Sequence, residues 1–168
     1  FRRVLFRSAL FAAGQLGVLS GRTAGALAWL EECLAIARER GATAIVGHVL
    51  QPLGVCCLAE QRLDLAARYL HESVAVAEQL GDRHDLATAL NNLAALLRRQ
   101  GRFAEAYPLC QRAVALLREL EDPENTGICI VTLGMVAVSL GRLDEADGLL
   151  QQARGIADAN GSRPIQVG

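Results

Sequence analysis

The side chains most able to do chemistry in this sequence are three histidines: His48, His71 and His84. None belongs to the HExxH pattern, in which two histidines one helical turn apart bind zinc. They occupy unrelated positions of the repeat described below, so we expect them to lie apart. The sequence therefore predicts no metal site and no cofactor.

The cysteines form neither a CxxC pair nor the spacing of a secreted disulfide framework. They are Cys33, Cys56, Cys57, Cys110 and Cys129. A free cysteine on an apolar helical stripe is usually a small buried hydrophobic residue. Because neighbours on a helix face different sides, we expect one of Cys56 and Cys57 in the core and the other at its boundary. This cysteine usage predicts a reducing, cytoplasmic location.

Catalytic patterns are missing from the sequence. It contains no GxxxxGK[ST] phosphate loop, no GxGxxG and no GxSxG. Acidic pairs such as Glu31–Glu32 and Asp144–Glu145 are typical of solvated faces or of first helical turns. We therefore predict no catalytic residue and expect that the chain is not an enzyme.

The elements that position all these side chains are predicted to be helices. The 168 residues include 28 Ala and 28 Leu, both strong helix formers, and only 4% aromatic residues. The net charge of −1, without a basic block, argues against direct binding of nucleic acid or of an anionic membrane. No apolar run reaches the roughly 18 to 20 residues of a membrane helix.

The chain repeats itself with a period of 40 residues and no insertion. The same two-residue turn signal opens the second half of each copy, as Gly21-Arg22, Gln61-Arg62, Gly101-Arg102 and Gly141-Arg142. An Ala follows in each copy, at Ala26, Ala66, Ala106 and Ala146. Each copy has two apolar stripes at helical spacing. One helix pair cannot bury both stripes, so stacking of pairs is predicted.

The segment 89–117, ALNNLAALLRRQGRFAEAYPLCQRAVALL, resembles a tetratricopeptide repeat of the long, kinesin-light-chain-like type. The resemblance extends over residues 9–163. It implies an all-α fold, an α-solenoid with a right-handed superhelix of four helix–turn–helix repeats. Their approximate bounds are 9–44, 45–84, 85–124 and 125–163, followed by a tail at 164–168. Similar arrays are common in large bacterial signalling and transcriptional regulators.

The first eight residues, FRRVLFRS, resemble the translation of a widely used sequencing adapter. We therefore expect residues 1–8 to be an assembly artefact and the chain to be a fragment of a longer protein. The last helix, at about 143–159, is then expected to expose apolar residues such as Leu149 or Ile156. We accordingly expect the isolated chain to self-associate or to be marginally stable.

The resemblance also implies which residues face a partner, because the first helices of such repeats line a concave surface. Alignment to that pattern places there Phe11, Ala12, Gln15, His48, Gln51, Pro52, Val55, Thr88, Asn91, Asn92, Ala95, Ile128, Val131, Thr132 and Met135. Asn91 and Asn92 are the leading candidates, because an amide can pair with a peptide backbone. Alternatively, one Asn bonds to the neighbouring repeat and the other to water.

Ile128, Val131 and Met135 lie on one helical face and form either an apolar contact surface or a stripe covered by the next helix. Pro52 lies inside an expected helix, so we predict a kink or a late helix start. The register places Leu70 in the core, where Leu70→Ala costs about 2–5 kcal/mol. It leaves Gln51 accessible, where Gln51→Ala stays within about 0.5 kcal/mol.

Three functions compete on this evidence. The first is a protein- or peptide-binding scaffold, whose partner is another protein or another domain of the parent chain. The second is a segment that senses a small inducer within a transcription activator. A closed, mostly apolar pocket would favour this function. The third is an enzyme domain, for which no constellation of groups is present. The sequence favours the scaffold.

Overall fold

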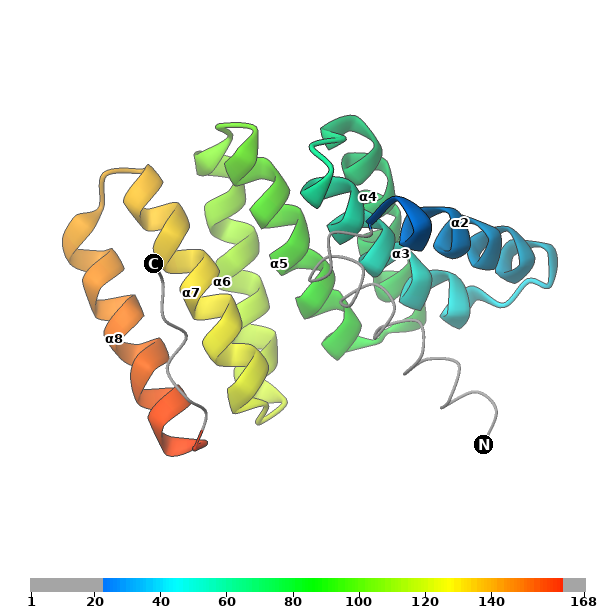
Figure 1. Ribbon diagram of the computed structural model, residues 1–168. Coiled ribbons are helices and arrows are strands. Elements are labelled where there is room, and N and C mark those ends of the chain that lie inside the picture. The colour runs from blue at the N-terminus through cyan, green and yellow to red at the C-terminus, as the bar shows by residue number, and fades with distance from the viewer. Residues whose placement is uncertain (1–22, 162–168) are drawn as a thin grey trace. The chain divides into compact units, whose positions relative to one another are not determined.

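The computed structural model describes residues 23–161, and within that range the chain forms seven α-helices and no strand (Figure 1). They are α2 (Thr23–Glu39), α3 (Thr43–Ala59), α4 (Leu63–Leu80), α5 (Arg83–Arg99), α6 (Phe103–Glu119), α7 (Pro123–Ser139) and α8 (Leu143–Ala159). The described part of the chain divides into two compact units between Asn92 and Leu93 of α5. The predictions for residues 1–8 and for Phe11, Ala12 and Gln15 fall outside the described residues.

Each of the seven described helices ends with the same backbone device. A residue with positive φ recurs at intervals of twenty, at Gly41, Gln61, Gly81, Gly101, Glu121, Gly141 and Gly161. The amide after it bonds back to the last turn of the helix, as Asp82 N does to Ala77 O at 3.1 Å. This is the Schellman arrangement, which satisfies carbonyls that would otherwise lack partners at a helix end. The regular turns make all the helices nearly equal in length.

Gln61 and Glu121 adopt this left-handed conformation without being glycine, at φ 59° and 54°. A side chain there strains the backbone by roughly 1–2 kcal/mol. We expect Gln61→Gly and Glu121→Gly each to raise the free energy of unfolding by up to about 1 kcal/mol, measured by urea denaturation. Gly101→Ala, at φ 75°, is the matched control and should destabilise. Unchanged stability in all three variants would contradict the backbone strain expected at Gln61 and Glu121.

In the first unit, α3 packs against both α2 and α4. Because helices flank it on two sides, Cys56 and Cys57 are both fully buried. The expectation that one of them lies at the core boundary is therefore wrong.

Pro52 lies within α3, which begins at Thr43 and continues to Ala59. The late helix start considered from the sequence is therefore wrong. A proline in a helix interior costs about 3 kcal/mol. Burial of the apolar α3 between its neighbours offsets this cost, as tertiary packing commonly does for helices.

Polar contacts join every second helix within each unit. In the first unit, Arg38 on α2 donates two hydrogen bonds to Glu72 on α4, at 2.6 and 2.7 Å. In the second unit, at the same repeat positions, Arg118 on α6 donates to Gln152 on α8 at 3.1 Å. These pairs are exposed and contribute little stability individually, but they show that the repeat positions are structurally equivalent.

In the second unit, α7 and α8 lie side by side and antiparallel (Figure 1). Leu149 and Ile156 are half-buried, and they lie against Gly134 and Gly127 of α7. The exposed apolar residues of α8 are instead Leu143, 64% exposed, and Leu150, 42% exposed. The sequence therefore predicted exposed apolar groups on this helix but named the wrong ones.

All five cysteines are buried and free. Burial raises the pKa of the Cys57 thiol to about 11 and the pKa values of Cys110 and Cys129 to about 12. These thiols therefore stay protonated at neutral pH, where the thiol form is a poor nucleophile and metal ligand. Among residues 23–161, no helix has the length and apolar character needed to cross a membrane.

Candidate functional site

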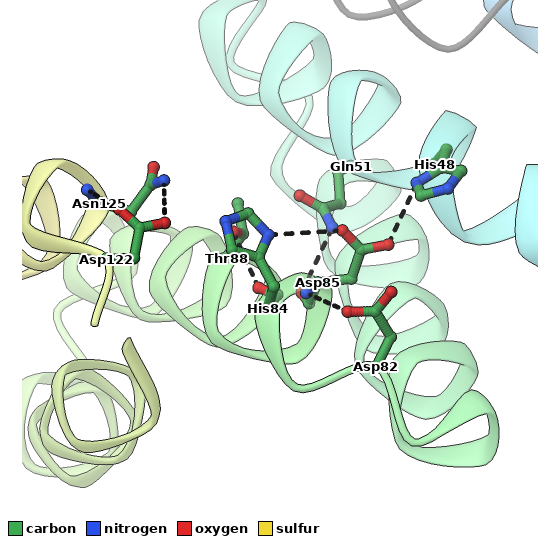
Figure 2. Close-up of polar contacts among 8 residues, drawn as sticks. All are labelled: His48, Gln51, Asp82, His84, Asp85, Thr88, Asp122 and Asn125. Atoms are coloured by element: carbon green, nitrogen blue, oxygen red, sulfur yellow. Dashed lines mark hydrogen bonds and ion pairs between the residues drawn. The ribbon is translucent and has the colours of Figure 1, made fainter. Parts of the chain in front are cut away.

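Polar side chains from α3 and from the start of α5 meet around the carboxylate of Asp85 (Figure 2). His48 on α3 places its Nδ1 atom 3.1 Å from Asp85 Oδ2. Both side chains are largely buried, at 21% and 17% exposure. With a proton on Nδ1, His48 donates a hydrogen bond to the carboxylate and thereby links α3 to α5.

His84 approaches the other oxygen of the same carboxylate, with its Nδ1 atom 3.9 Å from Asp85 Oδ1 (Figure 2). The expectation that the histidines lie apart is therefore wrong for His48 and His84, which both flank Asp85. That expectation compared repeat positions alone, whereas His48 near the start of the copy 45–84 and His84 at its end meet where α3 lies against the start of α5. His71 lies on α4 and is exposed. We call His48, Asp85 and His84 the His–Asp cluster.

Gln51 lies one helical turn beyond His48 on α3. It is only 9% exposed, and its Nε2 atom donates to the backbone carbonyl of Asp85 at 3.3 Å. Sequence analysis placed Gln51 on an accessible face, and that expectation is wrong because α5 covers its amide. The Gln51→Ala variant therefore loses a buried hydrogen bond, which typically costs about 0.5–1.5 kcal/mol.

Asn91 and Asn92, the two leading candidates, differ in exposure. Asn91 is 9% exposed, and its Oδ1 atom is buried without a hydrogen-bond partner. Asn92 is half-buried. A direct role of this pair in binding remains a prediction. Asn92 offers accessible surface to a partner. Asn91 offers a carbonyl oxygen that has no hydrogen-bond partner.

The other predicted residues of α3 and α5 are half-buried or buried. Val55, Thr88 and Ala95 are half-buried, and Pro52 is buried. The Thr88 hydroxyl donates to the carbonyl of His84 at 3.1 Å, within its own helix (Figure 2). These residues provide shape and packing, whereas His48, Gln51 and Asn91 provide polar atoms.

In the second unit, the predicted apolar residues of α7 lie at its surface. Ile128 is 50% exposed, Met135 is 40% exposed, and Val131 is half-buried. Thr132 is buried and bonds to Ile128 O of its own helix. Val138, which the sequence analysis did not include, extends the same stripe and is 49% exposed. The alternative of a stripe covered by another helix does not hold for Ile128 and Met135 within residues 23–161.

Sequence reasoning missed Asp85, the centre of the cluster. The signal was present, because Asp85 precedes Thr88 by one helical turn on the face that contains Asn91 and Asn92. Extending each predicted face by one turn towards the helix start would have included it. Asp82, which directly precedes α5, accepts from Asp85 N at 3.0 Å and fixes this first turn (Figure 2). Asp122 caps α7 in the same way through Asn125.

Comparison with protein families identifies the class of repeat. The family description "Tetratricopeptide repeat" matches residues 46–106 and 85–159, well over half of the chain. The chain therefore belongs to the tetratricopeptide repeat family. A second description, "Anaphase-promoting complex subunit 5", matches residues 2–59, less than half of the chain. Among curated proteins, the comparison finds no match.

Solved structures share the fold at low sequence identity. BtubC (BKLC) from P. vanneervenii matches with a TM-score of 0.76 and 23% identity, over 99% of this chain and 76% of its own. The apo form of RapI matches with a TM-score of 0.80 and 13% identity, over 92% of this chain and 57% of its own.

Aspartyl phosphate phosphatase F from Bacillus subtilis matches with a TM-score of 0.79 and 14% identity, over 95% of this chain and 42% of its own. This chain thus spans 57% of the length of RapI and 42% of the length of phosphatase F. The likeness establishes the fold, an α-solenoid of helix–turn–helix repeats. This family is typically non-catalytic, and the fold suggests a scaffold that binds proteins.

Proposed function

We propose that this chain is a non-catalytic scaffold that binds an extended protein segment on the α3 and α5 face centred on the His–Asp cluster. We further propose that it belongs to a larger bacterial, cytoplasmic regulator of signal transduction or transcription. The residues proposed to contact the partner are Asn91 and Asn92, and His48 and Gln51 are proposed mainly to position this face. The family fold supports the general class, and the polar atoms of this face support the choice of ligand.

The observation that favours a peptide ligand most is the unpartnered Oδ1 atom of Asn91. A buried polar atom without a hydrogen bond costs about 1–3 kcal/mol, which an incoming backbone N–H group would recover. The χ2 torsion of Asn is broad, so the amide can turn towards a ligand at small cost. Asn92, half-buried next to it, can both donate to and accept from the same peptide backbone.

The His–Asp cluster gives this face its rigidity. His48 and Gln51 both bond to Asp85, one to its carboxylate and one to its carbonyl. A face held in one arrangement loses less entropy on binding than a mobile one. We therefore assign His48, Gln51 and Asp85 mainly to positioning, and the two asparagines to contact.

Selection of peptides from a random phage-displayed library on the full chain tests this proposal. We expect enriched peptides whose affinity, measured by fluorescence anisotropy, falls about tenfold or more in Asn91→Ala and in Asn92→Ala. Asn160→Ala, at an exposed position after α8, is the matched control and should bind as the parent does.

Two outcomes would contradict the proposal. One is a library that yields no peptide with measurable affinity for the folded chain. The other is a selected peptide that binds equally well to the Asn91→Ala, Asn92→Ala and Asn160→Ala variants. Circular dichroism of each variant separates a lost contact from lost folding.

A sensor of a small inducer is the alternative function, and it needs a closed pocket. A hollow of about 200 Å³ lies between α2, α3 and α4, next to the Arg38–Glu72 ion pair. Pockets for drug-sized ligands usually measure about 300–1,000 Å³ and are mostly apolar. This hollow does not favour the sensor over the scaffold.

A further inference from the structure

The proposed peptide-binding face carries a negative charge at one end. Asp85 is the only acidic residue of α3 and α5, and α3 contains no Lys or Arg. Arg83 precedes Asp85 by two residues and therefore stands about 200° away around α5. Asp82, directly before α5, adds a second carboxylate at this end, since it accepts from Asp85 N at 3.0 Å. The charge on the side of α5 that contacts α3 is therefore negative.

Asp85 holds its charge in a largely buried position. Its side chain is 17% exposed, and its carboxylate lies between the rings of His48 and His84 (Figure 2). His48 Nδ1 lies 3.1 Å from Oδ2, whereas His84 Nδ1 lies 3.9 Å from Oδ1, beyond hydrogen-bonding distance. An uncharged imidazole donates one hydrogen bond and brings no positive charge. The cost of burying a carboxylate is offset most strongly by a cation, so a cationic donor gains more here than a neutral one.

The helical positions align this cluster with the two asparagines. Asn92 follows Asp85 by two helical turns, so both lie on one side of α5, roughly 10 Å apart along its axis. Asn91 follows His84 by the same interval and lies on the neighbouring line of the helix. An extended peptide advances about 3.3 Å per residue, so about three residues span this distance. A peptide that runs along α5 with its backbone at the asparagines therefore brings a side chain to the carboxylate.

The two ends of this stretch of α5 suit different groups of a ligand. At one end, the buried Oδ1 atom of Asn91 has no hydrogen-bond partner, and a peptide N–H group satisfies it. At the other end, an ammonium or guanidinium group pairs with the Asp85 carboxylate through charge-assisted hydrogen bonds, which are roughly twice as strong as neutral ones. Lysine and arginine carry these groups. An acidic side chain placed there would instead be repelled.

We propose that the His–Asp cluster is a specificity site that selects a lysine or arginine side chain of the bound protein segment, with the Asp85 carboxylate as its ionic partner. The basic residue lies about three residues from the peptide group that the asparagines bind. This inference rests on the peptide-binding function proposed above and adds a side-chain preference to it. Asp85 then contacts the ligand directly, in addition to positioning the face.

Peptides selected from the random phage-displayed library on the full chain test this preference. We expect Lys or Arg at one fixed position of the enriched peptides. Replacing that basic residue of a selected peptide by Gln should weaken binding about tenfold, because it removes one charge from a partly buried pair. The Asp85→Asn variant should bind the peptide and its Gln analogue with nearly equal affinity. Asp64→Asn, which removes an exposed carboxylate from the first turn of α4, is the matched control and should discriminate as the parent does.

The comparison of two peptides separates a charge contact from a positioning role of Asp85. A role in positioning alone lowers both affinities in Asp85→Asn by the same factor, and that result would overturn the proposal. If Asp85→Asn loses its helical circular dichroism, Asp85→Gln is the second variant, because Gln is favoured at this position of a helix start.

The composition of the selected peptides distinguishes failure of this proposal from failure of the peptide-binding function. Peptides that depend on Asn91 and Asn92 but contain no excess of Lys or Arg would overturn the specificity site and leave the peptide-binding function standing. A library that yields no binder would overturn both.

Discussion

Leu70→Ala is expected to lower the free energy of unfolding by about 2–5 kcal/mol. Leu70 on α4 is fully buried, and its side chain lies directly against Gly54 of α3. Truncation removes apolar contacts and leaves a cavity that the flanking helices fill only in part. Urea denaturation followed by circular dichroism measures the loss.

The matched control for this variant is Leu150→Ala, at the same position of the repeat two copies later. Leu150 is 42% exposed, so its truncation removes less buried surface. We expect a cost of about 1 kcal/mol, scaled from the buried apolar area. Equal losses at both sites would contradict the burial described here.

Gly54→Ala is expected to destabilise the chain by about 1–2 kcal/mol. A Cβ atom at Gly54 would lie only 2.6 Å from Leu70 Cγ, so the buried Leu70 has to move. Overpacking of this kind costs about 1–3 kcal/mol. This cost exceeds the about 0.5–1 kcal/mol that is gained by removing a helical glycine. Thermal and urea denaturation of the variant measure the difference.

Gly134→Ala, at the equivalent position of the repeat, is expected to stabilise the chain instead. There the nearest atoms of Leu150 are 3.4 Å away, and the half-exposed Leu150 can shift. The better helix propensity of Ala should then dominate and stabilise by about 0.5–1 kcal/mol. Destabilisation of similar size at both glycines would refute the close approach of α3 and α4.

The period of 40 residues was sufficient to predict the helices, because each turn follows one backbone rule. A left-handed residue can be anticipated wherever the repeat places Gly, and Gln61 and Glu121 occupy the same slots by register. Local sequence did not predict the uninterrupted α3. The cost of Pro52 is local, whereas the burial that offsets it depends on two neighbouring helices.

The candidate site was predicted less well, since its contacts join residues of different helices. Repeat alignment found His48 and Gln51, but their common partner Asp85 became evident only when α3 and α5 were placed together. The same placement buried Gln51, which a helical face considered alone leaves open. The α7 residues were predicted more simply, because their helical spacing alone defines the stripe.

The identical turns have a consequence for how such a gene can change in length. One residue inserted into a helix rotates every later side chain of that helix by about 100°, which moves core leucines to the surface. Copying or deleting a whole hairpin leaves each remaining turn and face as it was. Natural variants of this chain should therefore differ in length by multiples of its forty-residue unit, with smaller insertions confined to the short connections between helices.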